Sequence, residues 1–219
     1  MDIIQLRSKG CNVYLLERDG ENFLIDTGTP ASGKLIESQI ESSINGIIIT
    51  HAHFDHIGSA AFLQKKFDCE IFAHEKDLPY LRGTKKLKFS GFLGRLASFA
   101  ERFFRVEYPK DVKPIGEIAE VFSTEEIKHA SDKDFAVIHT PGHTPGSICI
   151  KVEEKLICGD LFRKGRKFGK VGLSPKVFCS DYSVYLNSIK AIMDLDFAFA
   201  FPGHGTPITK EEIEKILRL

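Results

Sequence analysis

Four side chains of the types that bind metal ions occur within one six-residue segment. The segment runs from His51 to His56 with the sequence HAHFDH, directly after a short β-branched run at 46–50. In an extended backbone His51 and His53 point to the same side, so that two imidazoles could bind one ion. Asp55 and His56 turn toward a second position. Imidazole suits zinc, iron, nickel and copper, whereas a carboxylate favours harder metals, so the segment predicts a metal site.

Three further candidate ligands follow, each in a turn after an expected strand. His143 lies in the sequence TPGHTPG, Asp160 ends the sequence LICGD, and His204 lies in PGHG. Glycine and proline at these turns favour tight, rigid backbone conformations. Any one of these residues alone would more often cap a helix or complete a core, but seven ligands suffice for two ions if one carboxylate is shared. We therefore predict these sets: His51, His53 and His143 at metal 1, Asp55, His56 and His204 at metal 2, and Asp160 as the bridge.

The elements that must position these residues are short apolar runs alternating with amphipathic segments. We expect strands at 11–17, 22–25, 46–50, 70–73, 118–122, 135–139, 147–152, 155–158 and 197–201. We expect helices at 34–40, 57–67 and 184–193, and a last helix opened by a capping box at 209–212. This order of elements predicts one α/β domain over residues 1–219, with sheets flanked by helices.

The composition narrows the class of protein. The 30 basic and 30 acidic side chains cancel, which argues against a protein that coats nucleic acid, and no apolar run approaches the roughly 20 residues of a membrane span. The N-terminal segment lacks the apolar core of a signal peptide, and the five cysteines are odd in number and widely spaced. We therefore expect a cytoplasmic protein with reduced thiols and a small-molecule substrate. The oligomeric state is not predicted.

The stretch from about 76 to 113 departs from the alternating pattern. Seven basic residues and one acidic residue lie between 82 and 105, and apolar residues including Phe89 and Phe92 recur at helical spacing. We predict a basic, aromatic, amphipathic helical insert. It could be a lid or groove wall with Phe89 and Phe92 against the substrate, or a plain surface helix; peripheral membrane contact ranks below both. Arg163 begins a second basic cluster, which could reach an anionic substrate or simply be solvated.

The segment 51–56 resembles the H-x-H-x-D-H motif of the metallo-β-lactamase-fold hydrolases. The turns around His143, Asp160 and His204 are similar to the later motifs of that family and occur in its order. The resemblance implies a four-layer αββα sandwich with two divalent ions at one edge, zinc first, with iron or manganese as alternatives. It also extends to LIDTG at 24–28, which implies that Asp26 orients ligands by hydrogen bonds, although a plain turn aspartate is the other interpretation.

The resemblance also implies a reaction. Two ions would activate a bridging hydroxide to cleave a small ester or thioester, and Asp55 could accept a proton as well as bind metal. By motif the chain resembles the glyoxalase II enzymes. Only a few residues follow His204, so we expect a short form that lacks the C-terminal helical domain of that family. A mononuclear Fe(II) persulfide dioxygenase is the main alternative, since it can keep the same motif. A lactonase, a phosphodiesterase or nuclease, and a non-enzymatic metal-binding module rank lower.

Overall fold

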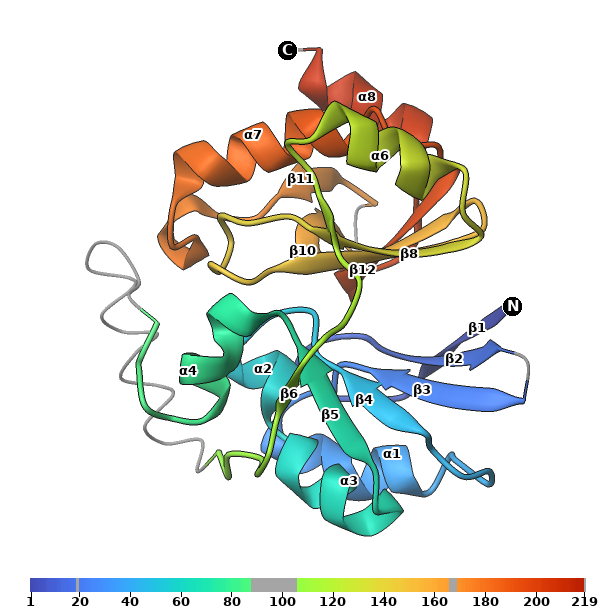
Figure 1. The fold of residues 1–219 in the computed structure, drawn as a ribbon, viewed down its shortest axis with the longest axis vertical. Coiled ribbons are helices and arrows are strands. Elements are labelled where there is room, and N and C mark those ends of the chain that lie inside the picture. Colours follow the sequence, from blue (N-terminus) through green and yellow to red (C-terminus); the bar gives the residue numbers. More distant parts are fainter. Residues whose placement is uncertain (19, 88–105, 166–168, 219) are drawn as a thin grey trace. The chain divides into compact units, whose positions relative to one another are not determined.

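The computed structural model describes residues 1–18, 20–87, 106–165 and 169–218, and the chain divides into two compact units (Figure 1). The first unit is Met1–Ile115 and the second is Gly116–Leu219. Each has its own sheet and its own core. Residues 88–105 of the predicted insert, which include Phe89 and Phe92, lie outside the described residues, so the insert and the single domain over 1–219 stay predictions.

The sheet of the first unit has its strands in chain order. Within the described residues it has six strands, and neighbouring strands pair in the order β1 to β6. The first three pair antiparallel and the last three continue parallel to β3. Their bounds are β1 (Asp2–Leu6), β2 (Val13–Arg18), β3 (Glu21–Ile25), β4 (Gly46–Ile48), β5 (Glu70–Ala73) and β6 (Lys113–Pro114).

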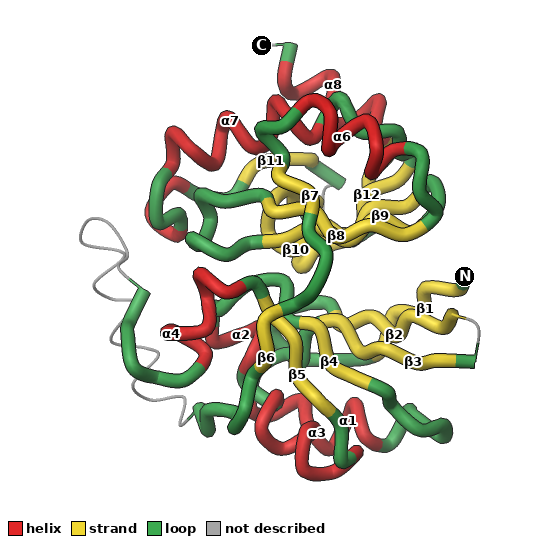
Figure 2. Tube along the Cα trace, viewed as in Figure 1, coloured by secondary structure: helices red, strands yellow, loops and turns green. Residues whose placement is uncertain are grey.

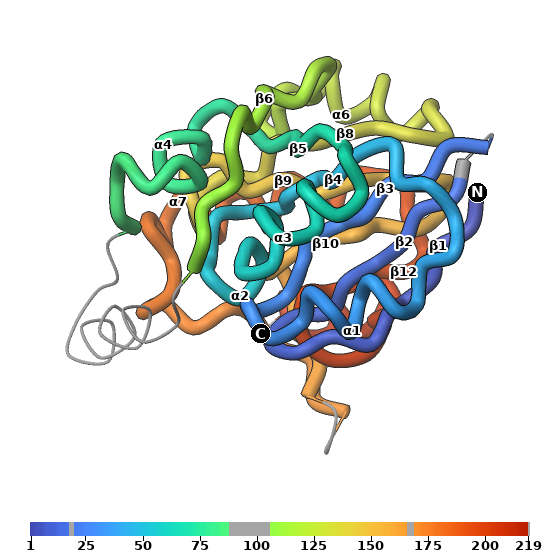
Figure 3. Tube along the Cα trace, turned by 90° about the horizontal axis from the view of Figure 1, so that it is seen from below, coloured from blue at the N-terminus to red at the C-terminus, as the bar shows by residue number. Residues whose placement is uncertain are grey.

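Helices α1 and α3 pack on one face of this sheet (Figures 1 and 3). The helical elements of this unit are η1 (Pro30–Ser32), α1 (Gly33–Glu37), α2 (Phe54–Ile57), α3 (Ala60–Phe67), η2 (Glu75–Asp77) and α4 (Leu78–Leu81). Ile36 of α1 and Leu63 of α3 are fully buried against the strand residues Leu24, Ile47 and Ile71. The helix expected at 57–67 corresponds to α3, which begins only at Ala60, because Ile57 ends α2 and the chain turns between the two helices.

The second unit has a mixed sheet in which the strand order is β13-β12-β10-β9-β8-β7, with β11 paired to β10. β8, β9 and β10 are antiparallel neighbours, whereas β10 and β12 run parallel. The bounds are β7 (Ala119–Glu120), β8 (Phe135–His139), β9 (Ile148–Val152), β10 (Lys155–Lys164), β11 (Val171–Leu173), β12 (Phe199–Gly205) and β13 (Ile208–Thr209).

Three helices cover one face of the second sheet, as Figure 2 shows. They are α6 (Thr124–Ser131), α7 (Tyr182–Ile192) and α8 (Lys210–Leu217), and a short η3 (Lys176–Phe178) precedes α7. Ile127, Ile189 and Ile213 contribute one buried apolar side chain from each helix to the core. The predicted capping box of the last helix is confirmed: Thr209 accepts a hydrogen bond from the backbone of Glu212, whose carboxylate accepts one from Thr209. Among the described residues, no helix has the length and apolarity to cross a membrane.

Candidate metal centre

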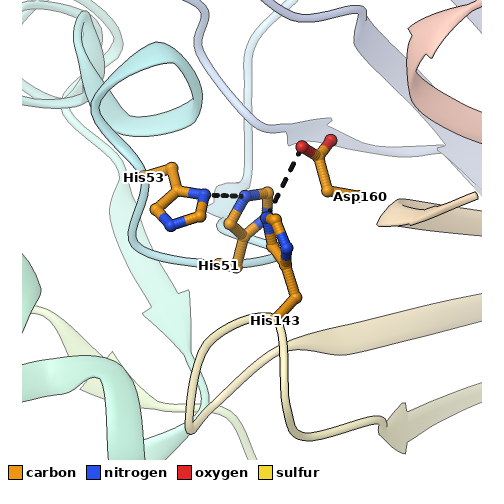
Figure 4. Close-up of side chains that lie close together, drawn as sticks. All are labelled: His51, His53, His143 and Asp160. Carbon is orange, nitrogen blue, oxygen red and sulfur yellow. Dashed lines mark hydrogen bonds and ion pairs between the residues drawn. The ribbon is translucent and has the colours of Figure 1, made fainter. Parts of the chain in front are cut away.

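The histidine-rich segment follows β4 and forms the turn into α2. His53 has an extended backbone and caps α2, so Asp55 and His56 lie in the first turn of that helix. All three histidines of the segment are buried. Nε2 of His51 lies 3.1 Å from Nδ1 of His53 (Figure 4), and the rings of His51 and His56 are 4.0 Å apart between centroids. The local fold of the first unit therefore gathers three imidazoles at the end of one strand.

Asp26 lies behind this group, where β3 ends. Its carboxylate accepts hydrogen bonds from the backbone N–H and the hydroxyl of Thr50, at 2.8 and 2.7 Å. The same carboxylate lies 2.7 Å from Nδ1 of His56. Because a carboxylate can only accept, this contact favours an N–H on Nδ1 and leaves Nε2 of His56 with its lone pair. Asp26 adopts a φ of 61°, an uncommon left-handed conformation for a residue other than glycine.

A second buried carboxylate holds the backbone between His51 and His53. Asp77 is fully buried at the end of η2, and its Oδ2 accepts a hydrogen bond of 2.9 Å from the backbone N–H of Ala52. Asp77 is not among the site residues that the sequence pattern predicts. Its position shortly after β5 could have indicated it. Because β4 and β5 are parallel neighbours, their carboxyl ends lie at the same edge of the sheet, and residues that follow them come close together.

The second unit brings together its own three predicted ligands. Oδ2 of Asp160, in β10, lies 3.5 Å from Nε2 of His143 (Figure 4) and 3.4 Å from Nε2 of His204. One carboxylate oxygen thus faces two imidazole nitrogens, one from the loop after β8 and one from β12. The parallel register of β10 and β12 shifts on both sides of Gly159, and this irregularity directly precedes Asp160.

The loop that carries His143 is held tightly. Gly142 has a φ of 122°, and a Cβ at this position would overlap the backbone nitrogen of Tyr185 in α7. Within the loop, the N–H of Gly142 donates to the carbonyl of Thr144 at 3.0 Å, and the hydroxyls of Thr144 and Ser147 lie 2.8 Å apart. Glycine is therefore needed at position 142 both for its backbone conformation and for its close approach to α7.

Cys179 contacts the ring nitrogen of His143 that does not face Asp160. Its Sγ lies 3.7 Å from Nδ1 of His143 and 3.7 Å from the carbonyl oxygen of Pro175. Burial raises the pKa of the Cys179 thiol to about 12, and the nearby charge of Asp160 adds to this effect. The thiol is therefore protonated at neutral pH. Nothing in its spacing along the sequence identified Cys179 as a neighbour of His143.

A different pair of histidines has structural partners. Nδ1 of His139 lies 2.8 Å from the carboxylate of Glu120, and its Nε2 lies 3.0 Å from the carbonyl oxygen of Pro145. Nδ1 of His74 accepts a hydrogen bond from the backbone N–H of Lys76. His139 thus ties the end of β8 to the loop that carries His143, whereas His74 caps η2.

The donor atoms of each unit suit a divalent transition-metal ion. The first unit offers the imidazoles of His51, His53 and His56 and the partly exposed carboxylate of Asp55. The second offers two imidazole nitrogens within 3.5 Å of one carboxylate oxygen. Neutral imidazole and carboxylate are common ligands of zinc, iron and manganese. The predicted substrate contact Arg163 is exposed on β10, where it pairs with Gly172 of β11.

Comparisons with known proteins agree on one family. Residues 7–204 match the model of the Metallo-beta-lactamase superfamily. The chain is 30% identical over 164 residues to the "Probable metallo-hydrolase MJ0888" of Methanocaldococcus jannaschii, which covers 72% of this chain and 71% of that protein. It is 28% identical over 218 residues to the hydroxyacylglutathione hydrolase GloC of Haemophilus influenzae, covering 95% and 92%. Among solved structures, TTHA1623 in a di-iron-bound form is similar with a TM-score of 0.70 and 25% identity, over 98% of both chains.

Proposed function

Because the chain belongs to the metallo-beta-lactamase superfamily, we propose that it is a dinuclear metal-dependent hydrolase that cleaves a small ester or thioester. The observation that carries this proposal is the position of Asp160, whose Oδ2 faces Nε2 of both His143 and His204. A carboxylate can bridge two ions only if it lies close to ligands of both. The proposed ligands are His51, His53 and His143 for one ion, Asp55, His56 and His204 for the other, and Asp160 for both.

When bound, two divalent ions, zinc first with iron or manganese as alternatives, would supply Lewis acidity toward the substrate carbonyl and would lower the pKa of bound water. The chain's own residues supply orientation and proton transfer. Asp26 holds His56 by its Nδ1, so that Nε2 is presented as the ligand atom. Asp55 lies in the first turn of α2, next to His56, where it can bind metal and accept a proton from the attacking water.

A thioester is the substrate class that we propose first. The relative GloC is named a hydroxyacylglutathione hydrolase, and this chain covers 92% of it. Arg163 is exposed on β10, three positions after Asp160, and its cation would attract an anionic substrate. Phe89 and Phe92 stay predicted substrate contacts.

The proposal also includes a cytoplasmic location. All five cysteines lie within the described residues and all are free thiols, as expected in a reducing compartment.

The test is elemental analysis of protein purified without added metal, followed by a hydrolysis screen of thioesters, lactones and phosphodiesters. Two equivalents of zinc, or of zinc with iron or manganese, together with thioester hydrolysis, would support the proposal. Asp160→Asn is the matched variant, and it should lower the occupancy of both ions together because its carboxylate is shared. Loss of a single ion in this variant would show that Asp160 does not bridge.

The same experiment separates the alternatives. One equivalent of iron, with oxygen uptake on glutathione persulfide and no thioester hydrolysis, would replace the hydrolase with a persulfide dioxygenase. If only a lactone or a phosphodiester is hydrolysed, the proposed metal site stands but the proposed thioester substrate is wrong. Failure to bind metal after reconstitution would leave a non-enzymatic role.

A further inference from the structure

Cys179 lies between η3 and α7 and contacts the proposed metal ligand His143. The thiol is buried, with Sγ 3.7 Å from Nδ1 of His143, while Nε2 of the same ring lies 3.5 Å from Oδ2 of Asp160. The imidazole therefore has the sulfur at one nitrogen and the carboxylate at the other. Sulfur is a weak acceptor as well as a weak donor, so the direction of the first contact decides which nitrogen carries the hydrogen.

The third atom of the cluster is the carbonyl oxygen of Pro175, which accepts the backbone N–H of Phe178 at 2.9 Å and lies 3.7 Å from Sγ. Its second lone pair can take the single S–H of Cys179, and our proposal assigns the S–H to it. The sulfur then faces His143 with its lone pairs, and Nδ1 must carry the N–H. A neutral imidazole has one N–H, so Nε2 keeps its lone pair.

We propose that Cys179 is a positioning residue, which holds His143 in the Nδ1–H tautomer and so presents Nε2 to a metal ion. The last step rests on the proposed function. Metal-binding histidines commonly donate their second N–H to a carboxylate, a carbonyl or water, and here a thiol takes that place.

The backbone supports this contact, because the segment after Cys179 is tied to the loop of His143. The N–H of Ser180 donates to the carbonyl of His143 at 2.9 Å. The N–H of Asp181 and the hydroxyl of Ser180 both donate to the carbonyl of Gly142, at 2.9 and 3.1 Å. Asp181 also caps α7 by accepting from two backbone N–H groups. The thiol and the imidazole are thus fixed to the same rigid frame.

The first test reads the tautomer of His143 directly, by NMR of isotope-labelled histidine in the metal-free full-length chain. The measurement is made at about pH 8, above the ordinary imidazole pKa. We expect the Nδ1–H form in the wild type and in Cys179→Ser, which keeps a hydroxyl donor and acceptor. Cys179→Val has a similar size and no polar atom, and we expect its His143 signal to move toward the Nε2–H form. An Nε2–H form in the wild type, or an unchanged tautomer in Cys179→Val, would overturn the proposal.

The second test measures zinc affinity by competition with a chelator. Loss of the acceptor for Nδ1–H should lower affinity about 10–100-fold in Cys179→Val, with recovery in Cys179→Ser. Cys149→Val is the matched control, because Cys149 is as deeply buried in the same unit but contacts the hydroxyl of Thr140. If His143→Gln leaves zinc affinity unchanged, the proposed metal site is wrong while the NMR result still decides the Cys179 contact. If affinity depends on His143 but not on Cys179, the positioning role is wrong.

Discussion

The carboxylate of Asp26 lies 2.7 Å from Nδ1 of His56, although 30 positions separate the two residues in the chain. The neighbouring residue strengthens this link, because both the N–H and the hydroxyl of Thr27 donate to the carbonyl of His56, at 2.8 and 2.7 Å. The end of β3 therefore fixes the side chain and the backbone of His56 together. Thr50 completes the network with two hydrogen bonds to Asp26.

Replacing Asp26 should weaken the proposed second metal site more than the first. In Asp26→Asn the amide N–H₂ takes the place of either Oδ2, which faces Nδ1 of His56, or Oδ1, which accepts from the backbone N–H of Thr50. In both orientations the new donor faces another donor. We expect about a 10–100-fold loss of affinity for the second ion, measured by metal titration. Asp194→Asn, at an exposed position, is the control. Equal loss of both ions would contradict a role centred on His56.

Removing the carboxylate of Asp77 should destabilise the turn between His51 and His53. Asp77→Val leaves the buried N–H of Ala52 without its 2.9 Å acceptor, which costs about 1–3 kcal/mol of unfolding free energy. Asp77→Asn keeps an acceptor oxygen and should lose less. Urea unfolding of the metal-free protein measures both variants. If Asp77→Val and the wild type unfold at the same urea concentration, the hydrogen bond to Ala52 does not stabilise the turn.

Much of the fold follows from the sequence pattern. The α/β metallo-β-lactamase fold predicted from the motifs is confirmed by the family match over 7–204. β5 (Glu70–Ala73) and β8 (Phe135–His139) have the predicted bounds, because each is an apolar run that ends at a turn. β1 and α6 were not predicted. Leu6 is the only buried residue of β1 and two residues of α6 are buried, so neither carries a strong apolar pattern.

Some residues of the proposed site are recognisable from a short stretch of sequence, whereas others reach it through contacts between distant parts of the chain. The residues from His51 to His56 stand out because four side chains of metal-binding types occur close together in the chain. Asp77 and Cys179 do not, since their contacts join positions 25 and 36 residues apart. Only the pairing of β4 with β5 and the packing of α7 against the loop of His143 bring these residues to their partners. A sequence pattern indicates candidate ligands more readily than it indicates the residues that contact them.

The loop of His143 should not tolerate a side chain at Gly142. In Gly142→Ala the Cβ would overlap the backbone of Tyr185, and the φ of 122° is itself unfavourable for alanine. Backbone rather than a flexible side chain is in the way, so we expect a loss of several kcal/mol, on the order of the largest single-residue effects. Gly172→Ala is the control, since a Cβ there meets nothing within 4 Å. Thermal unfolding compares the two, and a similar midpoint for both variants would show that the loop can move away from α7.

The ion pair at the start of α8 should make stability depend on pH. Nζ of Lys164 lies 2.7 and 2.9 Å from the two carboxylate oxygens of Glu212, and this hydrogen bond lowers the pKa of Glu212, helped by the N–H of Thr209. A carboxyl with a lower pKa in the folded chain than in the unfolded chain stabilises the fold above the unfolded pKa. That contribution is lost as the pH falls from about 5 through the folded pKa. Glu212→Gln removes the charge, so its stability should fall less than that of the wild type over this range. Urea unfolding at a series of pH values tests this, and parallel pH curves for the two proteins would exclude the effect.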